Sequence, residues 1–171
     1  MTKKSTQQDE EFSAIYMENF KDIISEEIDF EKQKQVNGFD LSVQEIYSLV
    51  GEGAIDFDNS KRVLPEYQPL KMVNNEYWQL TPGSYVIRYN EVVSVPLNAV
   101  GIIQPRSTLL RMGAHIVGAW WDSGYSGRGQ GLLITTQNMK MYKNARVAQI
   151  VFIISKKVHT GYEGKYQNEA K

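Results

Sequence analysis

Apolar residues near the start of the chain recur every three or four positions, a spacing that is typical of an amphipathic helix. The residues concerned are Phe12, Ile15, Tyr16, Phe20, Ile23, Ile24 and Ile28. Acidic residues occupy much of the opposite face, as on a helix that covers an apolar surface. The pattern predicts a helix over residues 9–28 that packs on the body of the protein or on a partner subunit.

After Gly38 the hydrophobic period shortens to two, which is typical of half-buried strands. Alternating segments and short apolar runs follow one another, at residues 39–43, 78–80, 85–89, 92–95, 99–103, 132–134 and 147–154. Turn residues such as Thr81-Pro82-Gly83 separate them, and residues 51–68 are rich in loop formers. There is no βαβ alternation. The pattern therefore predicts an all-β sandwich or barrel with one N-terminal α-helix.

Composition narrows the possible chemistry. The 171 residues suit a single domain. The chain has no cysteine and only two histidines, His115 and His159. Disulfides, thiolate zinc sites, iron–sulfur clusters, a cysteine nucleophile and a three-histidine metal site within one chain are thus excluded. We expect no membrane span and no secretory signal, and hence a cytoplasmic protein.

Charge is distributed unevenly along the chain. The net charge is −1, yet residues 101–171 carry ten basic and three acidic residues. Apolar residues are interleaved throughout this basic part, so a folded anion site is indicated and not a charged tail. Nucleic acid and a small phosphate ester both fit this observation. The alternative is a basic surface that balances the acidic front half of the chain.

Residues 104–111 place two guanidinium groups and two hydroxyls directly after an apolar strand. Arg106 and Arg111 can bind phosphate oxygens in a bidentate manner, and Ser107 and Thr108 add neutral donors. The functional interpretation is a polyphosphate-binding segment. The structural interpretation is a helix N-terminus capped by Ser107 or Thr108.

Residues 119–127 combine two tryptophans, an aspartate, a tyrosine and two glycines, which predicts a tight hairpin. Gly124 allows positive φ and close approach of a ligand to the backbone. Tyr125 offers a flat face to a sugar or a base, and Asp122 is a candidate general base for a water molecule. The same Asp-x-Gly pattern is also compatible with a simple turn.

The C-terminal segment contains two glycines among residues able to contact a ligand, namely Tyr162, Lys165, Tyr166 and Gln167. One interpretation is a disordered terminus. The other is a lid that becomes ordered over a ligand, with lysine supplying charge and tyrosine supplying stacking.

Five segments in this order resemble the superfamily of dUTP pyrophosphatases and dCTP deaminases. The matching sequences are Gly38-Phe39-Asp40-Leu41, Pro105-Arg106-Ser107-Thr108-Leu109 with Arg111 and Gly113, Asp122-Ser123-Gly124-Tyr125-Ser126-Gly127, Arg146-Val147-Ala148-Gln149-Ile150-Val151-Phe152 and Gly164-Lys165-Tyr166-Gln167. The last has the form of the deaminase and archaeal branch. The resemblance covers residues 36–170.

The resemblance implies a distorted β-barrel or jelly roll that assembles as a homotrimer with active sites between subunits. It divides the chain into an N-terminal helical extension (1–35), a β-barrel nucleotide-hydrolase domain (36–158) and a lid (159–171). Mg²⁺ would be held mainly by the substrate phosphates, so no protein metal ligands are expected. Neither a nucleic-acid nor a membrane partner is expected.

The resemblance also implies roles for particular residues. The triphosphate would be bound by Arg106, Ser107, Thr108, Arg111 and Gln149. Asp122 would orient the attacking water, Tyr125 would pack on the deoxyribose, and the backbone around Gly124 would read the uracil edge. Tyr162, Lys165, Tyr166 and Gln167 would form the lid.

Deaminases of this superfamily need a glutamate on the strand after the third motif, but no Asp or Glu lies between Asp122 and Glu163. The sequence therefore favours hydrolysis of a deoxynucleoside triphosphate, dUTP, to dUMP and pyrophosphate by water attack at the α-phosphate. The alternatives are a dCTP deaminase, alone or bifunctional, and a non-catalytic nucleotide-binding regulator. The link 128–131 is longer than usual and would reshape the base pocket.

Overall fold

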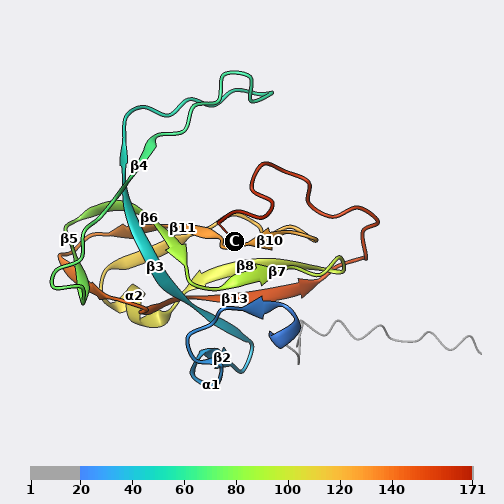
Figure 1. The fold of residues 1–171 in the computed structure, drawn as a ribbon, viewed down its shortest axis with the longest axis horizontal. Coiled ribbons are helices and arrows are strands. Elements are labelled where there is room, and N and C mark those ends of the chain that lie inside the picture. Colours follow the sequence, from blue (N-terminus) through green and yellow to red (C-terminus); the bar gives the residue numbers. More distant parts are fainter. Residues whose placement is uncertain (1–19, 171) are drawn as a thin grey trace, which may run out of the picture.

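The computed structural model describes residues 20–170, which form a predominantly antiparallel β structure (Figure 1). The helical elements are a 3-10 turn η1 (Phe20–Asp22), α1 (Phe30–Gln33) and α2 (Ser107–Arg111). The strands are β1 (Ile24–Ser25), β2 (Lys34–Gln35), β3 (Gly38–Val50), β4 (Glu66–Pro69), β5 (Tyr77–Leu80), β6 (Gly83–Tyr89), β7 (Val92–Ser94), β8 (Ala99–Pro105), β9 (Ala114–Val117), β10 (Ser126–Gly127), β11 (Gln130–Thr135), β12 (Met139–Tyr142) and β13 (Arg146–Ile154). No helix in the described part is long and apolar enough to cross a bilayer.

The main sheet has the order β8-β13-β3-β6-β11-β9, with β2 and β4 added to β3. Its outer strands β8 and β9 also lie against each other, so the sheet is nearly closed into a barrel. Two small sheets, β1-β7-β10 and β5-β12, complete the body. The predicted all-β barrel is confirmed.

Alternating burial along the strands forms the core. In β11, for example, Gly131 and Leu133 point inward while Ile134 is exposed. The largest apolar side chains that are fully buried are Phe39, Leu41, Ile46, Leu80, Ile87, Tyr89, Ile116, Leu133 and Ile150. Long strand β3 contributes to the centre of this core, and its bulge between Val43 and Glu45 bends it around the barrel.

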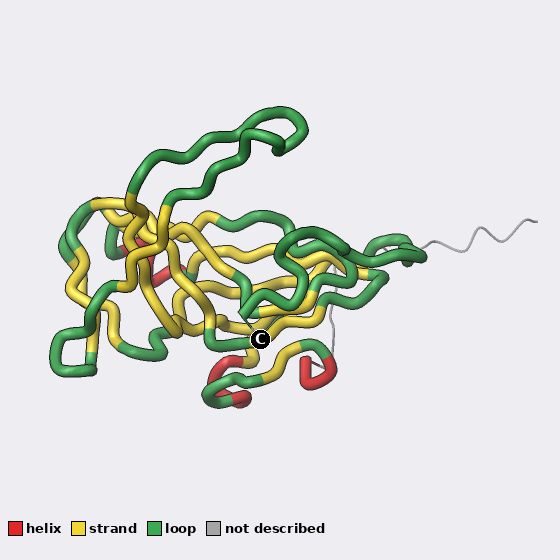
Figure 2. The backbone as a smooth tube through the Cα atoms, turned by 45° about the horizontal axis from the view of Figure 1, so that its top comes forward, coloured by secondary structure: helices red, strands yellow, loops and turns green. Residues whose placement is uncertain are grey.

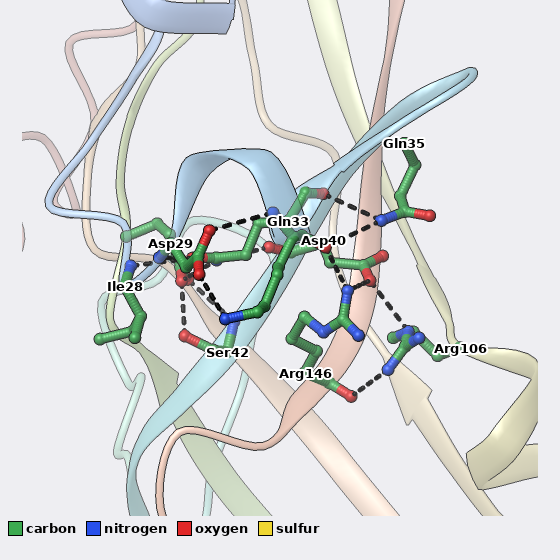
Figure 3. A network of polar contacts seen from close by, with 10 residues as sticks. Ile28, Asp29, Gln33, Gln35, Asp40, Ser42, Arg106 and Arg146 are labelled. Atoms are coloured by element: carbon green, nitrogen blue, oxygen red, sulfur yellow. Dashed lines mark hydrogen bonds and ion pairs between the residues drawn. The ribbon is translucent and has the colours of Figure 1, made fainter.

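The first half of β3 is buried on both faces. Its alternate polar side chains therefore point into the protein, where those of a half-exposed strand would face water. Asp40 and Ser42 are 2% and 1% exposed. Ser42 donates from its hydroxyl and its backbone N–H to the fully buried Glu91, at 2.5 and 2.9 Å. Gln33 of α1 donates to the Glu91 carboxylate at 2.6 Å and to the Asp40 carbonyl at 2.8 Å. The N-terminal segment is therefore joined to the barrel by buried hydrogen bonds (Figure 3).

The predicted helix over residues 9–28 is wrong in its described part, and residues 9–19 lie outside the described residues. Only η1 is helical, and Ile24 pairs with Val93 in the small sheet. Phe20 packs on Phe39, with ring centroids 5.6 Å apart, whereas Ile28 is exposed. Strand pairing of Ile24 with β7 buries the same side chains that suggested a helix, because their spacing alone does not decide the backbone conformation.

Residues 51–65 connect β3 to β4 as an arm that extends beyond the barrel (Figure 2). A single bridge, Ala54 to Val63, joins its two sides. Ile55 and Phe57 are fully or largely exposed there. The loop character predicted for most of this region is thus present, with apolar residues at its outer part.

Replacing Gln33 with alanine tests the buried connection. The variant removes two donor contacts and leaves the fully buried Glu91 carboxylate short of a partner. We expect the free energy of unfolding to fall by about 2–4 kcal/mol, measured by urea denaturation.

Gln35→Ala is the matched control. The Gln35 amide donates only to backbone carbonyls near the surface, at 3.1 and 3.4 Å, so its loss is expected to cost less than about 0.5 kcal/mol. Equal losses for both variants would show that the buried network does not anchor the N-terminal segment.

Candidate active site

An open pocket of about 640 Å³ lies between the base of the arm, the loop before β11 and the C-terminal segment. Six of its thirteen lining residues are aromatic. It is lined by Leu64, Tyr67, Ala119, Trp120, Trp121, Asp122, Tyr125, Gly129, Gln130, Tyr162, Lys165, Tyr166 and Glu169. The structure thus brings Asp122 and Tyr125 together with three of the four predicted lid residues.

Asp122 lies in a turn that is fixed from both sides. The Tyr125 N–H donates to the Asp122 carbonyl at 3.0 Å, and the buried Ser123 hydroxyl donates to the Ala99 carbonyl at 2.7 Å. Gly124 has φ +82°, a conformation that requires glycine here, since a Cβ would also overlap Gly161. The expected hairpin is replaced by this turn, because the following strand β10 pairs with β7. Asp122 itself is exposed to the pocket.

Tyr125 forms part of the pocket wall but is largely covered. Its ring meets Trp121 edge-on at 5.4 Å and Tyr162 at 5.8 Å. Burial raises the pKa of Tyr125, and the nearby Glu169 and Tyr162 raise it further. The phenol therefore remains protonated at neutral pH and can donate a hydrogen bond. Because Tyr125 is only 8% exposed, little of its ring is open to a ligand.

The C-terminal segment is ordered against the Asp122 turn. Gln167 accepts from the Ser126 N–H and donates to the Gly124 carbonyl, both at 2.9 Å. The Tyr162 N–H donates to the Ser123 carbonyl at 2.8 Å. Lys165 remains exposed at the pocket. The interpretation as a disordered terminus is therefore wrong for residues up to 170.

The predicted phosphate-binding residues form a second group, on α2 and β13. Arg106 Nε lies 3.0 Å from the buried Asp40 carboxylate, and Arg146 lies 3.3 Å from the same oxygen (Figure 3). Arg106 also donates to the Arg146 carbonyl at 3.2 Å. Burial raises the pKa of Asp40, and both guanidinium groups oppose that rise. Because both arginines retain partial exposure, the carboxylate orients them while leaving donors for a ligand.

The remaining members of this group are accessible. Ser107, Thr108 and Arg111 are exposed, and Gln149 is partly buried on β13. The predicted hydroxyl cap is wrong, because Arg106 occupies the N-cap position and no side chain caps α2. The guanidinium of Arg111 folds back to donate to the Ser107 carbonyl at 3.0 Å.

One chain does not bring the two groups together. None of the five predicted phosphate-binding residues lines the pocket that contains Asp122. In Figure 1, α2 lies at the opposite side of the barrel from the dark red C-terminal segment.

Glu169 is a pocket residue that the sequence did not single out. It accepts a hydrogen bond from Gln130 at 2.8 Å, and burial raises its pKa. Glu163, the next acidic residue after Asp122 in the sequence, is exposed and does not line the pocket. Asp40 was part of a recognised motif but had no assigned role. The only sequence signal for Glu169 was its position within the predicted lid segment, residues 159–171.

Residues 8–155 match the family of dCTP deaminase-like proteins. The chain is 39% identical over 150 residues to a probable deoxyuridine 5′-triphosphate nucleotidohydrolase from Methanosarcina acetivorans, covering 86% of this chain and 88% of the relative. It is 41% identical over 138 residues to a deoxyuridine 5′-triphosphate nucleotidohydrolase from Methanocaldococcus jannaschii, covering 80% and 88%.

A solved structure agrees in fold. The 2′-deoxycytidine 5′-triphosphate deaminase from Agrobacterium tumefaciens superposes with a TM-score of 0.58 at 17% identity. The match covers 79% of this chain and 44% of that chain, so less than half of the solved chain has a counterpart here. The family match covers most of this chain, and the barrel and the order of the five sequence motifs agree with it. The chain therefore belongs to the dCTP deaminase-like family.

Proposed function

We propose that this protein is a dUTP pyrophosphatase, which hydrolyses dUTP to dUMP and pyrophosphate. The observation that carries the proposal is the pocket in which Asp122 and Tyr125 meet the C-terminal segment. The archaeal relatives named as deoxyuridine 5′-triphosphate nucleotidohydrolases support the substrate and the reaction.

The pocket suggests how a nucleotide would be held. Its aromatic residues suit a flat base and a deoxyribose. Asp122, exposed at the pocket, would accept a proton from water as the water oxygen attacks the α-phosphorus. The bond from the α-phosphorus to the bridging oxygen breaks at the same centre, and pyrophosphate leaves. Lys165 would place a positive charge near the phosphates when the C-terminal segment closes.

The proposed cofactor is Mg²⁺ that arrives with the triphosphate. Residues 20–170 hold no cluster of three or more His, Asp or Glu side chains able to bind a metal ion. Mg²⁺ commonly keeps several waters and binds substrate phosphates with one or two carboxylates. The donor set of this pocket fits that arrangement, with Asp122 as the accessible carboxylate. Bound to the phosphates, the metal would neutralise part of their charge.

We propose further that the working form is a homotrimer with active sites between subunits. Arg106, Ser107, Thr108, Arg111 and Gln149 of one chain would then bind the triphosphate of a nucleotide whose base lies in the pocket of a neighbour. The separation of the two groups within one chain favours this arrangement. Arg106 is held by Asp40, and neither residue lines the pocket.

Product analysis tests the reaction. Incubation with magnesium and dUTP is expected to yield equimolar dUMP and pyrophosphate, separated by anion-exchange chromatography, while dCTP stays unchanged. Conversion of dCTP to dUTP would instead identify a deaminase, and no turnover of either nucleotide would favour a binding protein.

Asp122→Asn tests the proposed base. The amide cannot accept the proton of water, so we expect kcat to fall by about 10²–10⁴-fold. Binding of a dUTP analogue with an imido bridge between the α- and β-phosphates should change only a few-fold, measured by calorimetry. Asp58→Asn, at an exposed position on the arm, is the control. Near-normal turnover by Asp122→Asn would remove Asp122 from this role.

Mixing two inactive variants tests the shared site. Asp122→Asn and Arg111→Ala are each expected to be inactive as homotrimers. Suppose that a site takes Asp122 from one chain and Arg111 from the next. It is then intact only when an Arg111→Ala chain supplies Asp122 and an Asp122→Asn chain supplies Arg111. Random reassembly of equal amounts therefore restores roughly a quarter of the sites. Light scattering should show three copies of the 19.6 kDa chain. Absence of recovered activity after verified exchange would place both residues in one chain.

A further inference from the structure

We propose that Glu169, paired with Gln130, is a specificity-determining residue that reads the hydrogen-bonding edge of the base and selects uracil over cytosine. This inference rests on the proposed function, because it assumes that the pocket receives the base of a deoxynucleotide. It assigns a role to a carboxylate that the hydrolytic step does not use.

Backbone hydrogen bonds on either side of the Glu169 side chain place this residue at the pocket. The Arg128 N–H donates to the Glu169 carbonyl at 2.9 Å, and the Asn168 N–H donates to the Ser126 carbonyl at 2.8 Å. The Gln167 amide adds two contacts to the same loop. The C-terminal segment therefore lies along the loop that follows Asp122, and its last turn brings a carboxylate into the pocket.

The carboxylate is held by one amide. Gln130 Nε2 donates to Glu169 Oε1 at 2.8 Å, and both residues line the pocket. Within residues 20–170 no hydrogen bond is made to Glu169 Oε2. Burial raises the pKa of Glu169, while the charge of Arg88 lowers it.

This pair offers a donor and an acceptor side by side. An amide nitrogen carries two hydrogens, of which Glu169 takes one, and Glu169 Oε2 is an acceptor. Uracil has a carbonyl oxygen next to its N3–H, which complements a neighbouring N–H and carboxylate oxygen. Cytosine has an unprotonated N3 at the same place, so two acceptors would face each other. An acceptor buried without a donor is costly, and the mismatch therefore disfavours dCTP.

The backbone of Gly124, which the resemblance assigned to the uracil edge, does not line the pocket. Its N–H donates to the Val95 carbonyl and its carbonyl accepts from Gln167, both at 2.9 Å.

The surrounding side chains leave this selection to the pair. Trp121 and Tyr125 meet edge-on and present apolar surface to the pocket, which holds a base without distinguishing its edge. Asp122 is exposed and is assigned to water activation. In the described pocket lining, Glu169 and Asp122 are the two carboxylates, and only Glu169 is held against a donor that can form half of a base-reading pair.

Glu169→Gln tests the inference. A glutamine can turn either its oxygen or its NH₂ toward the base, so the acceptor requirement is lost while the volume is kept. We expect the preference for dUTP over dCTP to fall by about tenfold or more, with kcat for dUTP within a few-fold of wild type. The preference is measured as the KM for dUTP against the Ki of dCTP as a competitor. Glu163→Gln, an exposed glutamate of the same segment, should leave both values unchanged.

The outcomes separate this inference from the proposed function. Wild-type enzyme that fails to hydrolyse dUTP contradicts the proposed function, and direct binding of dUTP and dCTP to both proteins then still measures the preference. An unchanged preference in Glu169→Gln overturns the inference. A parallel weakening for dUTP and dCTP also overturns it, because that result is expected if Glu169 only fastens the C-terminal segment to Gln130.

Discussion

The carboxylates buried beside strand β3 constrain the structure around them. Glu91 is fully buried and Asp40 is 2% exposed, and a buried carboxylate without partners would cost several kcal/mol. Glu91 is satisfied by Gln33 and Ser42. Asp40 is satisfied by Arg106 and Arg146. The first requirement fastens the N-terminal segment to the barrel, and the second fixes the beginning of α2.

Because both carboxylates depend on β3, the N-terminal segment and the proposed phosphate-binding residues are linked. Gln33 bonds to the Asp40 carbonyl as well as to Glu91, and Arg146 donates to the Lys32 carbonyl. Arg106 is already paired with the buried Asp40, whereas Ser107 and Arg111 are exposed and can contact a ligand. Because a buried partner determines its position, Arg106 orients the start of α2 in addition to offering charge.

The pocket is assembled in a different way, from segments that have little core of their own. The loop at Asp122 is held by β7 and β8, and the C-terminal segment adds backbone hydrogen bonds to that loop. Opening of residues 160–170, which the proposed lid requires, would break the hydrogen bonds of Gln167 to Ser126 and Gly124 and leave the strands of the barrel paired.

The sequence by itself determined the family motifs, the grouping of Asp122 with Tyr125 and seven of the thirteen described strands, namely β3, β5, β6, β7, β8, β11 and β13. These features depend on side-chain period and on residues close together in the chain. The tertiary structure decided what depended on distant partners. Ile24 pairs with Val93 in place of a helix, and Asp40 meets Arg106. Glu169 reaches Gln130 across the pocket. Such contacts are set by how the barrel brings strands together, and no local pattern encodes them.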